Sequence, residues 1–282
     1  MRRSIIILMA LVALSGQANA QHWVSVGLRG GAATHLTTGD IKSGWVPSAM
    51  VDASYTYLWP VKNVELGIQT GLSLGYIGGT FSATVDEEYR NIDYLNHPMD
   101  YHNSLSSARE RVDGMALEIP AMMALRWNGL VLNAGLKLQV PCWYRYKQQI
   151  ADPLVEATYP EYSVTTTNEL ITGVVAEADL LKKGDYRDLC DVSLLLGLEI
   201  GYEWKLTEQQ DLLGLVGYFD GAPYGHKSGK STGRMIDVAP ITNAEYPVPE
   251  VKVNTIVGTY AERINYLAFG VKVYYRFGVP KL

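Results

Sequence analysis

The segment HPMDYH, residues 97–102, holds residue types found in several kinds of catalytic centre. It contains His97, Asp100 and His102, and three serines follow before residue 108. A serine beside a histidine base is the nucleophile of many hydrolases, and histidines with carboxylates can bind a metal ion. Catalysis requires the nucleophile and the base to meet, and the spacing here does not bring them together by itself. Because polar loops often contain such residues, we predict no catalytic residue and no metal ligand.

A second segment, YGHKSGKST at residues 224–232, resembles a phosphate-binding loop. That motif needs a glycine five residues before Gly229, where the sequence has Tyr224, and no strand-to-helix pattern surrounds it. We interpret the segment as a solvated loop and expect no cofactor. The net charge of −5 does not favour binding to a nucleic acid, so no such partner is expected.

The closing segment NYLAFGVKVYYRFG, residues 265–278, shows what kind of element must position these loops. One set of alternate side chains is apolar throughout, whereas the other set includes Gly270, Lys272 and Arg276. This alternation predicts a β-strand with different surroundings on its two faces. The same pattern recurs in seven upstream segments: 24–31, 48–59, 64–76, 115–127, 130–140, 194–204 and 212–220.

The connections between these segments alternate between short and long. Residues 60–63, 128–129 and 205–211 are short, and Asn128-Gly129 is a strong hairpin signal. The other connections are long and are expected to be loops: 34–46, 78–114, 148–189 and 221–263. This organisation predicts an all-β fold, an eight-stranded antiparallel transmembrane β-barrel with short periplasmic turns and long extracellular loops. Residues 162–178 and 251–260 are also strand-like, so the alternative is a barrel of ten strands.

The aromatic and charged residues indicate which face meets lipid. Six aromatic side chains of the apolar parity cluster at the short-turn end and predict a periplasmic girdle: Trp59, Trp127, Tyr202, Trp204, Tyr275 and Phe277. On the same parity, Tyr76, Tyr144 and Tyr146 are expected to form the opposite girdle. The apolar parity therefore faces lipid, and the other parity faces the lumen.

Charged residues on the lumen parity are expected to pair with one another, because an unpaired buried charge is costly. The predicted lumen charge network comprises Arg29, Asp52, Glu65, Glu118, Arg126, Lys137, Glu199, Glu203, Lys272 and Arg276. Since eight strands enclose an interior just wide enough for side chains, we expect no aqueous channel.

The N-terminus reads as an export signal, with Arg2 and Arg3 before an apolar run and Ala20 at the predicted cleavage site. We therefore divide the chain into a signal peptide, residues 1–20, and an outer-membrane β-barrel domain, residues 21–282. Cys142 and Cys190 lie near the long-loop ends of consecutive predicted strands, and they either form a disulfide or remain separate thiols.

Several segments resemble one protein family. The signal peptide, MALEIPAMMALRW at residues 115–127, the following VLNAGLKLQV and the closing VYYRF are similar to the PorT-like outer-membrane β-barrel proteins of Bacteroidota. The resemblance implies a barrel in the cell outer membrane of a Gram-negative bacterium. The closing strand also resembles the signal that the barrel-assembly machinery binds, although the chain continues beyond Phe277 to Leu282.

With the lumen filled and the outer wall facing lipid, the loops remain as the active part. We expect a non-enzymatic protein whose partners are outer-membrane lipid and an unknown protein or glycan at the loops. Its predicted roles are adhesion, envelope structure, or an accessory function in a secretion or surface complex. The alternatives are a rim-located hydrolase or acyl-modifying enzyme that acts on envelope lipid, or a small-solute pore if the strand count is larger.

Overall fold

The computed structural model describes residues 21–39, 41–92, 96–169, 173–179, 192–206, 211–223, 226–227, 233–238 and 251–278. The predicted signal peptide lies outside the described residues. Among the described residues, no helix is long and apolar enough to cross a membrane.

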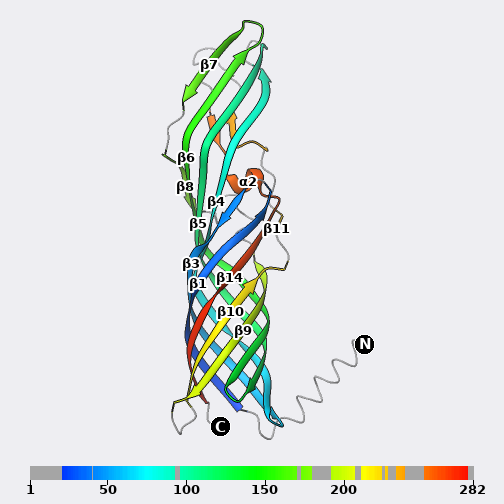
Figure 1. The fold of residues 1–282 in the computed structure, drawn as a ribbon, viewed down its shortest axis with the longest axis vertical. Coiled ribbons are helices and arrows are strands. Elements are labelled where there is room, and N and C mark those ends of the chain that lie inside the picture. The colour runs from blue at the N-terminus through cyan, green and yellow to red at the C-terminus, as the bar shows by residue number, and fades with distance from the viewer. Residues whose placement is uncertain are drawn as a thin grey trace, which may run out of the picture.

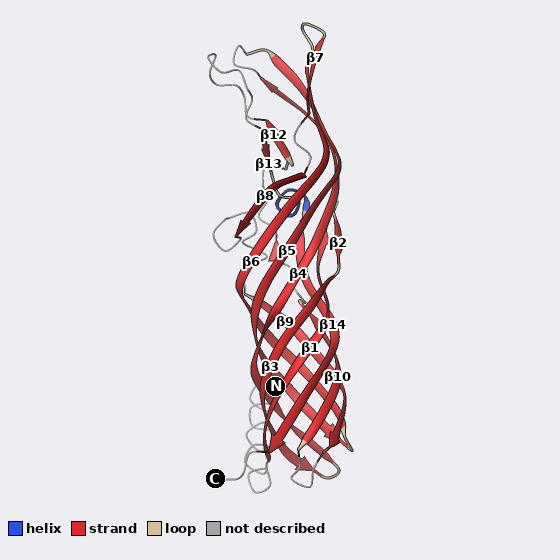
Figure 2. Cartoon of the chain, turned by 90° about the vertical axis from the view of Figure 1, so that its left-hand side faces the viewer, coloured by secondary structure: helices blue, strands red, loops and turns tan. Residues whose placement is uncertain are grey.

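Eight antiparallel strands close into a barrel in the lower half of the molecule (Figures 1 and 2). β1 pairs with both β3 and β14, which closes the ring. In ring order the strands are β1 (Gln21–Thr38), β3 (Val46–Val61), β4 (Val64–Ile92), β5 (Pro98–Trp127), β6 (Leu130–Tyr159), β9 (Ser193–Lys205), β10 (Leu212–Gly221) and β14 (Arg263–Gly278). The predicted eight-stranded barrel is confirmed.

The remaining described elements lie outside the ring. β2 (Lys42–Gly44) pairs with β4, β7 (Val164–Glu169) and β8 (Gly173–Asp179) pair with β6, and β11 (His226–Lys227) pairs with β14. β12 (Ile236–Val238) and β13 (Val251–Val253) form a separate two-stranded sheet, followed by the short helix α2 (Ile256–Tyr260). The strand-like segments that suggested a ten-stranded barrel therefore do not enter the ring.

The short turns lie at the lower end of the barrel. Trp127 pairs with Leu130 across the Asn128-Gly129 turn, and both turn residues have positive φ, 50° and 84°. This conformation fits a two-residue hairpin, whose twist matches that of its strands. The predicted Asn-Gly hairpin is confirmed.

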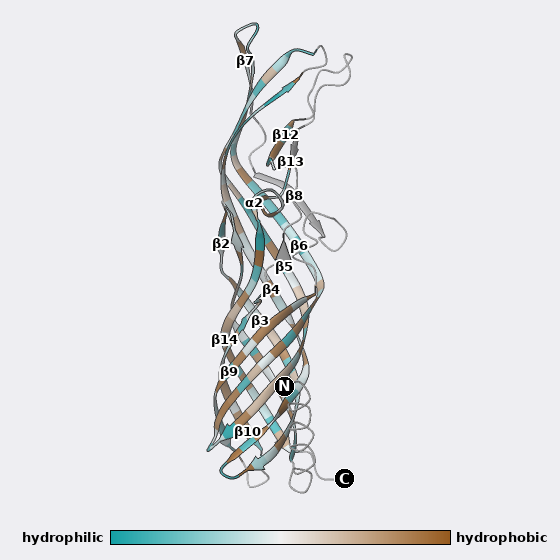
Figure 3. Ribbon diagram, turned by 90° about the vertical axis from the view of Figure 1, so that its right-hand side faces the viewer, coloured by the Kyte–Doolittle hydropathy of each residue, from teal (hydrophilic) through white to brown (hydrophobic). Residues whose placement is uncertain are grey.

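The two faces of each barrel strand differ as the alternation predicts. Leu198 and Phe269 point outward, with 44% and 47% of their surfaces exposed. Arg29, Glu118 and Lys137 on the other parity are buried inside the ring. Figure 3 shows hydrophobic residues concentrated on the barrel, whereas the region above it is more hydrophilic. The outer wall therefore needs an apolar surrounding, since monomeric soluble proteins rarely expose apolar patches of this size.

The connection at residues 78–114, expected to be a long loop, is instead mostly a pair of long strands. β4 runs without interruption to Ile92, β5 returns from Pro98, and β6 rises beside them to Tyr159. We call this upper sheet the blade: residues 77–92, 98–114 and 144–159 with β7 and β8 (Figure 1). Its outward face continues the lipid-facing side of the barrel, and its inner face continues the lumen side.

These residues form ordered strands and not a loop because the blade has its own hydrophobic core. Phe81, Leu105 and Ile150 point to the inner face, where residues 233–238 and 251–261 cover them. The covering segment contributes Met235, Ile236, Val238, Ile256 and Val257, each nearly inaccessible to solvent. Burial of this apolar surface stabilises an ordered sheet above the barrel. This sheet was not predicted because the covering segment is distant in sequence from the strands that it packs against.

One bulge changes the facing of β6 near the top of the barrel. Met115 pairs with Trp143 and Ala116 pairs with Pro141, so that Cys142 is an extra residue on β6. An extra residue reverses the parity of the residues that follow it, up to the next irregularity of the strand. Trp143 is consequently exposed and Tyr144 is buried. The expectation that Tyr144 and Tyr146 face outward in the upper girdle is wrong, because Tyr146 shares the parity of Tyr144 and packs against the buried core.

Candidate functional site

The upper part of the lumen is filled by a cluster of charges centred on Arg29. Its guanidinium binds Asp52 at 3.1 Å, Glu118 at 2.7 Å and Asp220 at 2.8 Å. Lys137 also contacts Asp220, at 2.8 Å. These side chains come from five different strands, so their ion pairs link opposite walls of the barrel.

A second group of charges fills the lower lumen. Arg276 and Arg126 both contact Glu203, at 2.8 and 3.4 Å, and Arg276 also lies over the Trp23 ring. Asn133 joins the two groups, because it accepts a hydrogen bond from Arg126 at 2.7 Å and donates one to Glu199 at 2.8 Å.

Nine of the ten residues named for the lumen network are buried inside the barrel: Arg29, Asp52, Glu118, Arg126, Lys137, Glu199, Glu203, Lys272 and Arg276. Lys272 contacts Glu199 at 3.2 Å. Glu65 is the exception, since it is only half-buried and lines the lower mouth of the barrel. The sequence reading missed Asp220, although it shares the inward parity of Val216 and Tyr218 at the end of β10.

The buried lumen charges balance. Among the described residues, five cations (Arg29, Arg126, Lys137, Lys272, Arg276) face five carboxylates (Asp52, Glu118, Glu199, Glu203, Asp220), and each of the ten takes part in a salt bridge. A network without net charge is the arrangement that makes burial of so many ions tolerable. The described lumen is thus occupied by side chains over the height of this network.

The aromatic residues predicted as the periplasmic girdle all lie on the outer wall near the short turns. Trp127, Trp204, Tyr202, Tyr275 and Phe277 are exposed, and Trp59 is partly exposed. At the other end of the apolar band, Trp45 and Trp143 are exposed. An outward apolar band between two sets of aromatic rings is the surface of a transmembrane barrel. The chain is therefore an outer-membrane β-barrel protein.

Above the barrel, carboxylates of the blade hold the covering segment in place. Glu110, fully buried on β5, accepts hydrogen bonds from the backbone N–H of Ile256 at 2.5 Å and from Gln148 at 2.9 Å. Glu87 on β4 accepts the N–H of Met235 at 2.8 Å and the hydroxyl of Tyr260. These contacts could not be predicted from the sequence, because carboxylates in a predicted loop look like solvated charges.

The aromatic residue Tyr89 adds a second type of anchor. Its ring stacks on that of Tyr101, with centroids 5.1 Å apart, and the guanidinium of Arg234 lies 3.9 Å from the Tyr89 centroid. Its hydroxyl accepts the N–H of Val238 at 3.3 Å. A further tyrosine, Tyr260 of the covering segment, contacts Glu87. Burial raises the pKa of Tyr260, so its hydroxyl stays protonated and donates to Glu87. The blade and its covering segment form one packed unit.

The residues of HPMDYH do not come together as a catalytic group. His97 contacts Tyr162, with 3.3 Å between Nε2 and the hydroxyl, and Asp100 forms an ion pair with Arg90 at 2.6 Å. His102 lies between Asp86, at 2.7 Å, and Glu156, at 3.4 Å. Both carboxylates raise the pKa of His102, Asp86 more strongly. Among the described residues, no serine hydroxyl is hydrogen-bonded to His102.

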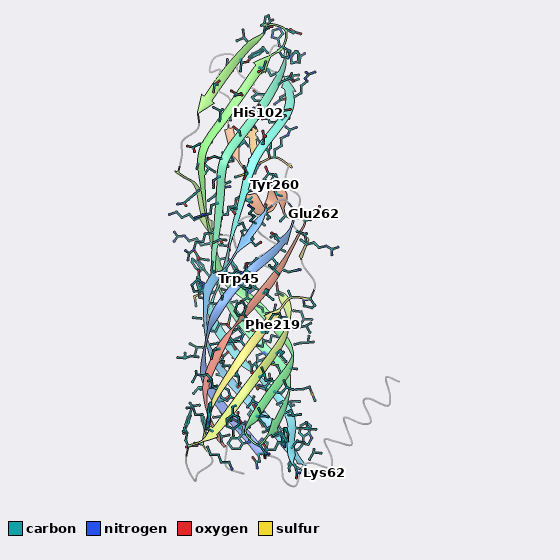
Figure 4. All side chains as sticks on the ribbon, in the orientation of Figure 1. Trp45, Lys62, His102, Phe219, Tyr260 and Glu262 are labelled. Atoms are coloured by element: carbon teal, nitrogen blue, oxygen red, sulfur yellow. The ribbon has the colours of Figure 1, made fainter. Side chains whose placement is uncertain are left out.

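A hollow of about 640 Å³ opens beside His102 (labelled in Figure 4), next to a bulge in the pairing of β4 with β5. The pairing of β4 with β5 shifts between Ala83 and Val85, and Ser106 is skipped where β5 pairs with β6. Ser106 donates to the Ala151 carbonyl at 3.1 Å and contacts Asp152 at 3.0 Å. The hollow is lined by Thr84, Val85, Asp86, His102, Ser104, Leu105, Ser106, Asp152, Pro153 and Leu154.

Two other sequence features fall mainly outside the described residues. Of the segment at residues 224–232, only His226 and Lys227 are described, as β11 beside β14. Cys142 is exposed on β6, but Cys190 lies outside the described residues. In the described part of the chain, no group of three His, Cys, Asp or Glu side chains is arranged to hold a metal ion.

No protein-family model and no curated protein matches the sequence. The resemblance to PorT-like proteins therefore stays a prediction. The fold is similar to the attachment invasion locus protein Ail of Yersinia pestis, with 7% identity, a TM-score of 0.32, and coverage of 91% of this chain and 99% of Ail. Neisserial surface protein A is also similar, with 8% identity, a TM-score of 0.29, and coverage of 92% of this chain and 98% of that protein. The outer-membrane protease OmpT of Escherichia coli has 8% identity and a TM-score of 0.29, with coverage of 92% of this chain and 96% of OmpT. Similarity this distant assigns neither an activity nor a partner.

Proposed function

We propose that this outer-membrane barrel is a non-enzymatic binding protein that presents the blade to a partner outside the cell. The observation that carries the proposal is the buried core of the blade, which is closed by Met235, Ile236 and Ile256. A sheet with its own core is a pre-organised surface, and such surfaces lose less conformational entropy on binding than mobile loops do. The barrel then acts as an anchor in the membrane.

The outward face around His102 supports the choice of binding surface. The hollow there combines hydroxyl and carboxylate groups with the apolar side chains of Pro153 and Leu154. Concave sites with a few convergent polar groups are typical of ligand recognition. A protein loop or a glycan of the cell surface fits this chemistry, in adhesion or as part of a surface or secretion complex.

A photo-reactive amino acid at Thr84, exposed at the rim of the hollow, tests the proposal in living cells. We expect a discrete crosslinked product that disappears when Ser104→Arg and Leu154→Arg fill the hollow. The same reagent at Lys62, in a turn at the opposite end of the barrel, is the control and is expected to give no such product (Figure 4). A product that persists with the hollow filled, or no product from Thr84, would contradict the proposal.

A further inference from the structure

A row of cation, hydroxyl and cation crosses three strands where the blade leaves the barrel. Lys42 on β2 pairs with Ser82 on β4, and Ser82 pairs with Arg109 on β5. Residues opposite one another on antiparallel strands share a face, and Lys42 and Arg109 are both exposed on the outward side. All three line a hollow of about 190 Å³, together with Ser43, Gly44, Thr80 and Phe81.

The two cations of this row have no carboxylate partner in the described part of the chain, where no Asp or Glu oxygen lies within 4.0 Å of either. Neighbouring cations differ. Arg111, for example, binds Asp113 at 2.9 Å. Lys42 and Arg109 therefore give the hollow a positive charge that no described carboxylate neutralises.

Trp45 shows how far the row of Lys42, Ser82 and Arg109 lies from the apolar band of the barrel. Its indole is 49% exposed and packs edge-on against Phe269, a lipid-facing residue, with ring centroids 5.1 Å apart. Tryptophan at the end of an apolar band marks the membrane interface. Figure 4 shows Trp45 near the upper end of the barrel. Lys42 is three residues from Trp45, which is at most about 10 Å of extended chain and within reach of the headgroup layer.

The charge of the outward face changes sign further from the membrane. Asp86, Glu88 and Glu156 lie on the same face nearer the tip of the blade, around His102. A large soluble polyanion that approached from outside would meet these carboxylates. An anion held in the membrane surface would meet the basic row and the neutral Arg111–Asp113 ion pair beside it. The distribution of charge therefore favours a ligand that belongs to the membrane.

We propose that Lys42 and Arg109 bind a phosphate group of a glycolipid in the outer leaflet, with the Ser82 hydroxyl as an additional donor. Lysine and arginine form strong charge-assisted hydrogen bonds with phosphate oxygens. This site is separate from the partner surface around His102. It fixes the rotation and depth of the barrel in the membrane beside the base of the blade.

Lipid binding in detergent tests the site directly. The folded protein in a zwitterionic detergent is titrated with diphosphoryl lipid A, and separately with the same lipid after dephosphorylation, while native mass spectrometry counts bound lipid. We expect the phosphorylated lipid to bind at least about tenfold more tightly, and the double variant Lys42→Gln/Arg109→Gln to bind it about 25-fold more weakly than the wild type, the attraction typical of two cations at an anionic membrane surface. Binding of the dephosphorylated lipid is expected to stay unchanged.

The matched control is Lys62→Gln/Lys205→Gln, which removes two exposed cations at the periplasmic end. It is expected to bind like the wild type, and heat-dependent gel mobility checks that all variants are folded. An equal loss in the control, or no preference for the phosphorylated lipid, would overturn the proposal. Equally tight binding of the bisphosphorylated glucosamine disaccharide without acyl chains would overturn the membrane source of the ligand.

Discussion

Arg29 and Asp220 form an ion pair across the lumen, with 2.8 Å between Nη1 and Oδ2, although 191 residues separate them in sequence. Lys137 binds the other oxygen of the same carboxylate at 2.8 Å. One side chain of β10 therefore joins β1 and β6 from the inside. This carboxylate forms ion pairs with two buried cations at once.

The change Asp220→Asn is expected to lower the free energy of unfolding by about 3 to 5 kcal/mol, because Arg29 and Lys137 then keep an uncompensated charge in the lumen. Urea unfolding of the barrel in lipid vesicles, followed by tryptophan fluorescence, measures the change. Glu262→Gln is the control, since it removes a carboxylate of equal charge from an exposed position. Equal stability of Asp220→Asn and the wild type would show that the network contributes little to stability.

The change Glu110→Ala is expected to loosen the segment that covers the blade while the barrel stays folded. The backbone N–H of Ile256 and the amide of Gln148 lose their acceptor, at a local cost of about 1 to 3 kcal/mol. Limited proteolysis and hydrogen exchange of residues 251–261 measure the effect. The exposed Glu88→Ala change serves for comparison. Unchanged protection in Glu110→Ala would mean that the hydrophobic contacts alone hold the segment.

The part of the blade around His102 is expected to be more stable at mildly acidic pH than at alkaline pH. Hydrogen bonds to Asp86 and then Glu156 raise the pKa of His102 above its ordinary value of 6.5. A raised pKa in the folded state contributes stability that is complete below pH 6.5 and is lost as the pH rises through the folded-state pKa.

Hydrogen exchange near residues 86 and 102, corrected for the intrinsic rate, measures this pH dependence. Slower exchange at pH 6 than at pH 8.5 is the expected result, and His102→Gln should abolish the difference. A His102 NMR titration with a midpoint at or below 6.5 would contradict the assignment.

A disulfide between Cys142 and Cys190 remains a prediction. Cys142 lies at the β6 bulge at the top of the barrel, where the chain begins to form the blade. Titration of the unfolded, unreduced protein with a thiol reagent is expected to find no free thiol. Two free thiols per chain would exclude the disulfide. Reduction before unfolding provides the reference value of two.

The sequence by itself determined the barrel. Strict alternation defines which side chains share a face, and the Asn128-Gly129 turn defines a hairpin through its own backbone preference. Both are local properties of the chain. The cost of exposing Arg126 or Lys137 to lipid then decides which face points inward. These arguments need no knowledge of which strands are neighbours in space.

Only the tertiary structure decided which charges meet, where the parity changes and how the blade is held. Asp220 can form an ion pair with Arg29 because closure of the ring places β10 and β1 on either side of β14. Tyr144 turns inward because one unpaired residue, Cys142, shifts the register. Glu110 becomes a buried anchor only when residues 251–261 fold back onto the blade. Each outcome depends on contacts between distant segments, which local alternation and turn preference do not encode.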